Sequence, residues 1–249
     1  PKVQDGFAPL LDGFIRVPFN DITAIETALK QHKNIVAILV EPIQGEGGVN
    51  IPAPDYLNKI RTLCDQHDLL MMLDEVQTGI ARTGAWFAFQ HNQITPDVCT
   101  LAKALGNGVP IGACMAKGKA SQLLTAGKHG STFGGNPLAC SAALAVLNTI
   151  ENQQLCQQAL DKGHLINQAF SEQLKNTPHV IDIRHQGMMI GIELDIPCTE
   201  LVGLALANGL LINVTGEKNI RLLPPLIMNN EQIDLLVSNL SALIIGHIK

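Results

Sequence analysis

The 249 residues are enough for one large domain or two smaller ones, each with a substantial core. Hydrophobic residues make up 46% of the chain and charged residues 16%, which predicts a folded protein rather than a disordered one. The net charge of −5, with no run of Lys or Arg, argues against a surface for nucleic acid or anionic membranes.

Neither the cysteines nor the histidines are spaced for metal binding. The six cysteines form no CxxC pair, and the histidines show no HxxxH or HExxH pattern, so no metal site is predicted. Cysteines scattered over apolar stretches indicate reduced, buried thiols in a cytoplasmic protein. No apolar run reaches membrane-spanning length and no signal peptide is visible. The missing initiator Met leads us to expect a fragment or a processed chain.

The first part of the chain alternates helices with short apolar runs. Residues 21–32 and 54–67 have the apolar spacing of amphipathic helices. Three apolar runs predict parallel strands buried on both faces: residues 35–41, 69–75 and 97–103. Residues 112–116 are a candidate for a fourth strand. This order predicts an α/β sheet with right-handed crossovers.

The second part of the chain has a different pattern. Residues 137–155 predict a helix of small residues, and the polar, Gln-rich stretch that follows is the expected domain boundary. We therefore expect a large domain over 1–155 and a small α+β domain over 156–249. Its expected elements are a helix at 156–175, two strands around Gly187, a helix at 198–208 closed by Gly209, two short strands (LLINV and NIRLLPP) and a helix at 230–246.

The predicted parallel strands deliver charged residues to one rim of the sheet. They end in Glu41, Asp74 and Lys103, and ligands of open α/β sheets bind at the carboxyl ends of the strands. This set suits a cofactor held by a lysine as a Schiff base better than a metal ion, which needs more ligands. Asp74 would keep a pyridine nitrogen protonated, and Lys103 would transfer protons.

Each of these features also has an ordinary structural explanation. A lysine at a strand end is usually solvated, and an acid pair after a strand often caps a helix. The glycines of 44–49 and 106–112 resemble phosphate loops, but neither spacing fits GxGxxG followed by a helix, so a dinucleotide site is not expected. The joint occurrence of the rim residues is what favours the Schiff-base cofactor.

Four segments in chain order resemble class III aminotransferases of fold type I, and most of all the acetylornithine and ornithine enzymes. They are VEPIQGEGGV (40–49), LDEVQTGIARTG (73–84), TLAKALGNGVPIGA (100–113) and HGSTFGGNPLAC (129–140). The resemblance implies an α/β fold class: part of a cofactor-binding large domain, with a mostly parallel sheet and helices, followed by a small α+β C-terminal domain. It also implies that the family's N-terminal part, with its phosphate cradle and ring-stacking aromatic, is missing.

The resemblance implies pyridoxal 5'-phosphate as the cofactor and assigns residues to it. Lys103 and Asp74 would be catalytic. The implied cofactor-binding residues are Asp74, Glu75, Val76, Gln77, Lys103 and Thr132. Among them, Val76 would pack on the ring, Gln77 would reach its hydroxyl, and Thr132 would bind the phosphate held by a neighbouring subunit. A homodimer with a shared active site is therefore implied.

The implied substrate-binding residues are Ser131, Arg221 and Glu46. Arg221 matches an arginine that grips a substrate α-carboxylate, because a guanidinium binds a carboxylate bidentately. Glu46 would neutralise Arg221, so that one site accepts an ω-amine and then 2-oxoglutarate. Glu41 is expected to support the site structurally, and His129 to lie behind it.

The reaction implied is transfer of an amino group from N2-acetyl-L-ornithine to 2-oxoglutarate, in arginine biosynthesis. Two alternatives remain open. The amino donor could be ornithine, since Ala81 stands where many acetylornithine enzymes carry glycine, or it could be 4-aminobutyrate. The chain could also be a truncated product that acts as a non-catalytic dimerisation or binding module.

Overall fold

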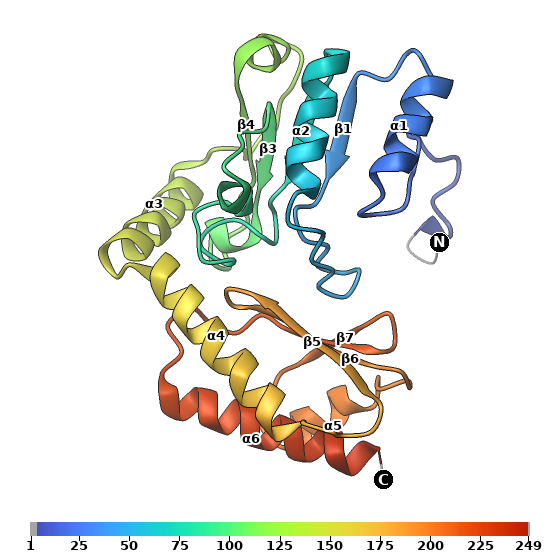
Figure 1. Ribbon diagram of the computed structural model, residues 1–249. Helices are drawn as coiled ribbons and strands as arrows, with labels where there is room; N and C mark the ends of the chain where they lie inside the picture. Colours follow the sequence, from blue (N-terminus) through green and yellow to red (C-terminus); the bar gives the residue numbers. More distant parts are fainter. Residues whose placement is uncertain (1–3, 249) are drawn as a thin grey trace.

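The computed structural model describes residues 4–248, which form two four-stranded sheets, each with its own helices (Figure 1). The first group of elements is α1 (Ile22–Gln31), β1 (Ala37–Val40), α2 (Tyr56–His67), β2 (Leu70–Asp74), β3 (Val98–Leu101), β4 (Ala113–Ala116) and the 3₁₀ turns η2 (Ala88–Asn92), η3 (Lys103–Leu105) and η4 (Gly118–Gln122). The helix α3 (Pro137–Asn152) packs with this first group through Ala143 and Ile150. The second group is α4 (Leu155–Gln173), β5 (Val180–Gln186), β6 (Met189–Leu194), α5 (Leu201–Ala207), β7 (Asn213–Thr215), β8 (Asn219–Leu222) and α6 (Asn230–His247).

The first sheet has the order β1-β2-β3-β4, and its first three strands are parallel, as the apolar runs predict. The fourth strand, β4, runs antiparallel to β3. The expected burial of β1 on both faces is wrong. Leu39 of β1 is 57% exposed and Val36, just before the strand, is 73% exposed, so the described residues leave part of this edge strand uncovered.

The predicted helix over 137–155 is confirmed but ends three residues earlier, and the separate helix predicted from residue 156 begins at Leu155. The helix α3 ends at Asn152, Gln154 takes a left-handed φ of +52°, and α4 starts at Leu155. Figure 1 shows α3 and α4 following one another along one side of the molecule. The largest buried cluster is made of side chains from Ala159 onward. We propose that the domain boundary lies at 155–156.

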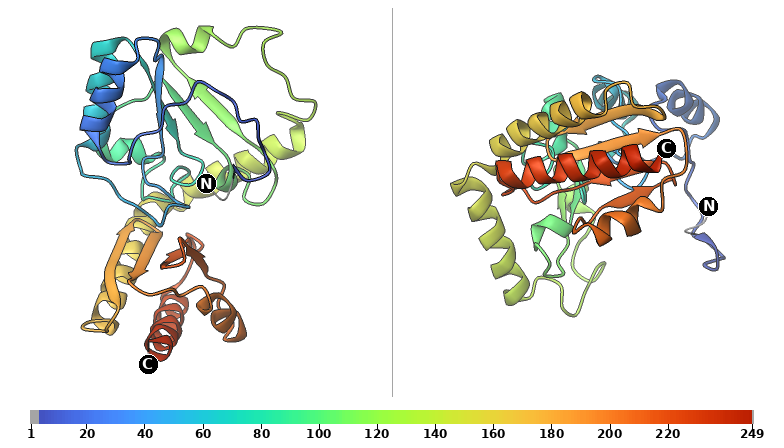
Figure 2. Two further views of the ribbon diagram at one scale, coloured as in Figure 1. Left: turned by 90° about the vertical axis from the view of Figure 1, so that its right-hand side faces the viewer. Right: turned by 90° about the horizontal axis from the view of Figure 1, so that it is seen from below.

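The second sheet has the order β5-β6-β8-β7 and is antiparallel throughout. Its two faces differ, because side chains alternate along a strand. Ile190 and Ile192 of β6 are fully buried with α4, α5 and α6. Met189 faces the other way and packs on Ile43 and Val49 of the large domain. Figure 2 shows the three helices gathered below this sheet.

Close contacts to backbone groups join the two halves of the molecule. The guanidinium of Arg82 donates hydrogen bonds to the carbonyls of Met188 (3.0 Å) and Pro224 (2.6 Å). Burial lowers the pKa of Arg82 to about 10. Gly187, at a left-handed φ of +55°, packs against the backbone of Gly163 on one side and of Thr83 on the other. A Cβ at Gly187 would collide with the backbone of Thr83, and a Cβ at Gly163 would collide with the backbone of Gly187.

The cysteines only partly follow the expectation of buried thiols. All six are free. Cys64, Cys99 and Cys198 are buried, and burial raises the pKa of the Cys64 thiol to about 12. Cys114 is exposed, since it lies on β4, whose side chains are all exposed. No helix of the described residues has both the length and the apolar character needed to cross a membrane.

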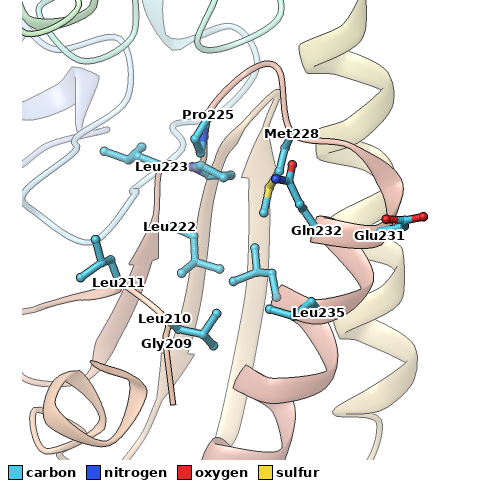
Figure 3. Close-up of a pocket in the computed structure, with 12 residues that line it drawn as sticks. Gly209, Leu210, Leu211, Leu222, Leu223, Pro225, Met228, Glu231, Gln232 and Leu235 are labelled. Atoms are coloured by element: carbon cyan, nitrogen blue, oxygen red, sulfur yellow. The ribbon is translucent and has the colours of Figure 1, made fainter. Parts of the chain in front are cut away.

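An apolar groove of about 620 Å³ lies between β8, the segment before β7 and the start of α6 (Figure 3). The side chains of Leu211, Leu222, Met228 and Leu235 line it. None of the site residues predicted from the sequence lies in this groove. The groove therefore belongs to the small domain and is separate from the rim of the first sheet.

Candidate active site

Asp74 lies at the carboxyl end of β2, where the sequence predicts it. It pairs in register with Thr100 of the neighbouring strand β3. Its Oδ1 accepts hydrogen bonds from the backbone N–H of Val76 (3.0 Å) and from the hydroxyl of Thr100 (3.3 Å). Both bonds hold the carboxylate at the rim, where it is half-buried. Thr100 is a partner that the sequence analysis did not single out.

Lys103 follows β3 at the same rim, three residues after the partner of Asp74. Its side chain is exposed, and its backbone has a left-handed φ of +44°. A non-glycine residue in this region costs on the order of 1–3 kcal/mol, and such residues cluster at functional sites. The chain therefore turns sharply at Lys103, directly after the strand, and leaves the amine accessible.

Glu75 points away from this rim. It is 1% exposed, and its carboxylate accepts hydrogen bonds from the Thr78 hydroxyl (2.8 Å) and the N–H groups of Ala88 (2.8 Å) and Phe89 (3.0 Å). Burial raises the pKa of the Glu75 carboxyl, and the three donors oppose that rise. The structure thus directs Glu75 into the large domain, where it fastens η2 to β2.

Arg221 of β8 forms a second cluster at the junction of the domains. Its guanidinium contacts the carboxylate of Glu46 (2.6 Å), the side-chain oxygen of Gln77 (3.0 Å) and that of Asn213 (2.9 Å). The side chain of Arg221 is only 10% exposed, whereas that of Glu46 is 70% exposed. The carboxylate of Glu46 can therefore move into solvent, whereas the shielded guanidinium of Arg221 then needs another carboxylate, because a buried charge left unpaired is costly.

Gln77 joins the two clusters. It follows Asp74 and Val76 in the chain, and its side chain reaches Arg221. Gly45 packs directly against the amide of Gln77, so a larger residue at position 45 would displace it. Glu41 accepts a hydrogen bond from the N–H of Gly45 (2.9 Å), which agrees with the supporting role expected for Glu41.

Ser131 and Thr132 lie apart from these clusters. Both are exposed in the loop between η4 and α3, which Figure 2 shows on the outside of the molecule. Phe133 and Leu138, next to them, are 80% and 74% exposed. Within residues 4–248, no hydrogen bond joins this loop to Asp74, Lys103 or Arg221. The predicted site residues are therefore only partly brought together within one copy of the chain.

The sequence analysis missed two residues next to the site. Arg184 donates a hydrogen bond to the carbonyl of Val49, and Asn213 accepts one from Arg221. Both are recognisable only from the pairing of the strands. Arg184 pairs with Gly191, which pairs with Arg221, which pairs with Asn213. These register positions come from strands far apart in the chain, and no local motif reports them.

A parallel α/β rim with a lysine and a carboxylate, joined to a small antiparallel domain, defines the class of protein. The sequence profile described as "Aminotransferase class-III" matches residues 1–244. The chain belongs to the class-III aminotransferase family, and its α/β fold is that of the family's solved structures.

Curated relatives are acetylornithine aminotransferases. The one from Nitrosomonas europaea is 53% identical over 98% of this chain and 62% of its own length. The one from Methanocaldococcus jannaschii is 45% identical over 96% of this chain and 60% of its own length. The chain thus spans about 60% of the length of the curated relatives it matches.

Solved structures superpose closely on the chain. An ornithine aminotransferase from Toxoplasma gondii, with partial occupancy of PLP at its active site, has a TM-score of 0.93 and 35% identity, over 98% of this chain and 59% of that one. An acetylornithine aminotransferase from Elizabethkingia anophelis has a TM-score of 0.87 and 40% identity, over 94% of this chain and 63% of that one.

Proposed function

We propose that this chain carries the catalytic lysine and the substrate arginine of a pyridoxal-phosphate-dependent acetylornithine aminotransferase. The observation that supports the proposal most directly is the pair formed by Lys103 and Asp74. An accessible amine on a left-handed backbone stands on the same rim as a carboxylate held in place by two hydrogen bonds. The chemistry of the reaction requires an amine and a carboxylate close to one cofactor, and the neighbouring strands β2 and β3 supply one each.

The residues present fit pyridoxal phosphate. One oxygen of Asp74 receives both of its hydrogen bonds, and the other is free, within the described residues, to face a ring nitrogen. Lys103 supplies the amine that binds the aldehyde. Val76 and Gln77 are expected to contact the ring, and Thr132 of a second copy the phosphate. When bound, the cofactor supplies an electron sink for the substrate carbanion.

The chain's own groups then perform the remaining work. Asp74 keeps a proton on the ring nitrogen, which increases the electron withdrawal by the ring. Lys103 Nζ, once released, carries a proton from one carbon to another. Arg221 binds the α-carboxylate of 2-oxoglutarate in the half-reaction where Glu46 has moved aside. In the other half-reaction Glu46 covers Arg221, and an ω-amine without a neighbouring carboxylate is accepted.

The acetylornithine donor is favoured by the names of the most similar curated relatives, and ornithine is the alternative donor suggested by the superposed structures. We further propose a cytoplasmic homodimer that works in arginine biosynthesis. The exposed Phe133 and Leu138, beside Ser131 and Thr132, offer an apolar surface for the second copy.

The test uses protein expressed from its complete reading frame and titrated with pyridoxal phosphate. We expect an imine absorbance band that acetylornithine removes and 2-oxoglutarate restores. Lys103→Ala should lose the band and slow turnover by about 10²–10⁴-fold, whereas Lys117→Ala, a change of another exposed lysine, should keep both. A band that persists in Lys103→Ala, or spectra that no amine changes, would contradict the proposal.

A further inference from the structure

Two arginines stand in one row across the second sheet. Arg184 of β5 pairs with Gly191 of β6, and Gly191 pairs with Arg221 of β8. Residues paired across strands share a face of the sheet. Ile190 and Ile192 on either side of Gly191 point to the helices, so the row faces the large domain.

A loop of the large domain lies across this row. It runs from Gln44 to Asn50 and carries Glu46. The N–H of Gln44 donates to the carbonyl of Asn50 (3.1 Å), and the N–H of Asn50 donates to the carbonyl of Gln44 (3.0 Å). Val49 of the loop is fully buried on Met189. The bare backbone of Gly191 allows this approach, because a Cβ there would lie 3.1 Å from the Cβ of Val49.

Arg184 holds the loop by its backbone. Its Nε donates to the carbonyl of Val49 (2.9 Å) and its Nη2 to the carbonyl of Gly48 (2.6 Å). The same guanidinium is oriented by the carboxylates of Asp182 (2.7 Å) and Glu193 (2.6 Å). Its side chain is only 14% exposed, so these bonds are largely shielded from water. Charge-assisted bonds of this kind are about twice as strong as neutral ones.

The held part of the loop is strained. Val49 has a φ of +56°, a conformation that is an outlier for a β-branched residue. Gly48, beside it, has a φ of +113° and packs on Asn219, which also accepts from Arg184 Nη2 (2.7 Å). Such backbone persists only where surrounding contacts enforce it. Arg184 supplies two of these contacts, on the two carbonyls next to the strain.

We propose that Arg184 is a positioning residue for substrate selection: it fastens loop 44–50 to the small domain and so keeps Glu46 within reach of Arg221. The inference rests on the proposed function and deepens it. The carboxylate of Glu46 is 70% exposed, so its contact with Arg221 does not by itself fix the position of the loop. The anchor of Arg184 at the other side of the same loop, largely shielded from water, makes Glu46 return to Arg221 whenever no carboxylate occupies it.

Loss of the anchor has a directional consequence. With the loop released, Glu46 covers Arg221 for a smaller fraction of the time. Arg221 then binds the α-carboxylate of glutamate and 2-oxoglutarate as well as before or better, whereas ω-amine donors meet an uncovered guanidinium. The ratio of kcat/KM for the ω-amine donor to kcat/KM for glutamate should fall, which a general loss of stability would not produce.

The first measurement is hydrogen exchange of the loop in Arg184→Met, in protein without added cofactor. The N–H groups of Gly48, Val49 and Asn50 bond within the loop and report its opening. They should exchange about tenfold faster or more, the factor expected for one lost charged hydrogen bond. In Arg184→Lys, which can keep one carbonyl contact, the exchange rates should lie between those of the unaltered protein and those of Arg184→Met.

The second measurement is the half-reaction with each donor, followed through the cofactor spectrum of the holoenzyme. Arg184→Met should lower the donor ratio by about tenfold, and Arg184→Lys should restore part of it. Arg61→Met is the matched control. Arg61 is 17% exposed and pairs with the carboxylates of Asp65 and Asp97, but it touches neither the loop nor β8. Arg61→Met should change the rates with both donors by the same factor.

The outcomes are distinct. Unchanged exchange in Arg184→Met overturns the anchor, and changed exchange with an unchanged donor ratio overturns its role in selection. Equal losses with both donors would likewise reduce Arg184 to a structural residue. If the unaltered holoenzyme converts no amine, the proposed function and the selection role fall together, and the exchange experiment still decides whether the anchor exists.

Discussion

At the scale of single residues, the environment of each charged group determines what it does. Asp74 and Glu75 are neighbours with opposite surroundings. Asp74 stays at the rim, while Glu75 is enclosed with three donors. The alternation of side chains along β2 separates them, because consecutive residues of a strand point to opposite faces. An acid pair after a strand therefore combines one reactive group with one structural group.

His185 is a residue whose titration should affect stability. Burial first, and the neighbouring His164 second, lower the pKa of its imidazole. The two rings are 6.2 Å apart, and the pocket they line also contains Asp161. A lowered folded-state pKa means that the unfolded chain binds the proton better. The stabilising contribution is therefore present above the usual histidine pKa, near 6.5, and is lost as the pH falls through the lowered value.

We expect the free energy of unfolding of the unaltered protein to fall more steeply below pH 6.5 than that of His185→Gln. The measurement is urea unfolding at a series of pH values between about 7.5 and 5, a range that spans the usual histidine pKa. Comparing the two proteins removes the contributions of the other histidines, which both share. Parallel curves would show that His185 does not couple to folding.

At the scale of elements, the close approach of backbones decides which residues are tolerated. The helix α4 crosses the turn between β5 and β6 at Gly163, where a Cβ would run into the backbone of Gly187. Gly203 in the middle of α5 has nothing within 4 Å of the position of a Cβ. The two glycines lie in helices and differ only in what surrounds them.

Gly163→Ala should therefore destabilise the protein by about 1–3 kcal/mol or more, the range for overpacking. Gly203→Ala should stabilise it by about 0.5–1 kcal/mol, because alanine has the higher helix propensity. Midpoints of unfolding in urea check both changes. A loss of similar size at both positions would show that the contact between α4 and the β5–β6 turn contributes little.

The sequence predicts these elements well where the local pattern is sufficient. The three parallel strands and the rim residues Asp74 and Lys103 follow from apolar runs that end in charged residues. The direction of β4 does not follow, because a run of four apolar residues is compatible with either pairing. The end of α3 is predicted three residues too late, since the left-handed Gln154 stands in a stretch of good helix formers.

The row formed by Arg184, Gly191 and Arg221 is the clearest example of an arrangement that the sequence does not predict. Arg221 is identified by its resemblance to a family motif, whereas Arg184 lies in no such motif. Its importance comes from the register of three strands and from a loop more than 130 positions earlier in the chain. Only the folded structure places these groups together.

At the scale of the whole molecule, the two sheets are joined by few but buried bonds. Arg82 donates to Met188 and Pro224, and its own carbonyl accepts from the N–H of Met188 (3.0 Å). Arg82→Met would leave two buried carbonyls without their donor. We expect a loss of about 1–3 kcal/mol for each group left unsatisfied, and unfolding that is less cooperative, because the contact between the halves then lacks two of its buried hydrogen bonds.

Calorimetry of Arg82→Met checks this expectation. A broader or split transition, with a lower first midpoint, is the expected result. Arg16→Met, a change of an exposed arginine, should leave the transition as it is. One sharp transition at the unaltered temperature in Arg82→Met would mean that other contacts join the halves.

Gly191 offers a practical means of adjustment to an enzyme engineer. It is the spacer between two arginines, and it touches neither the cofactor rim nor the carboxylate of Glu46. A Cβ at position 191 would stand 3.1 Å from Val49 and 3.3 Å from the carbonyl of Gly48, so the loop would have to move outward by a few tenths of an ångström. Residues of increasing size at this one position would thus set the spacing of the two domains stepwise. Donor preference could then be tuned without altering any group that takes part in the reaction.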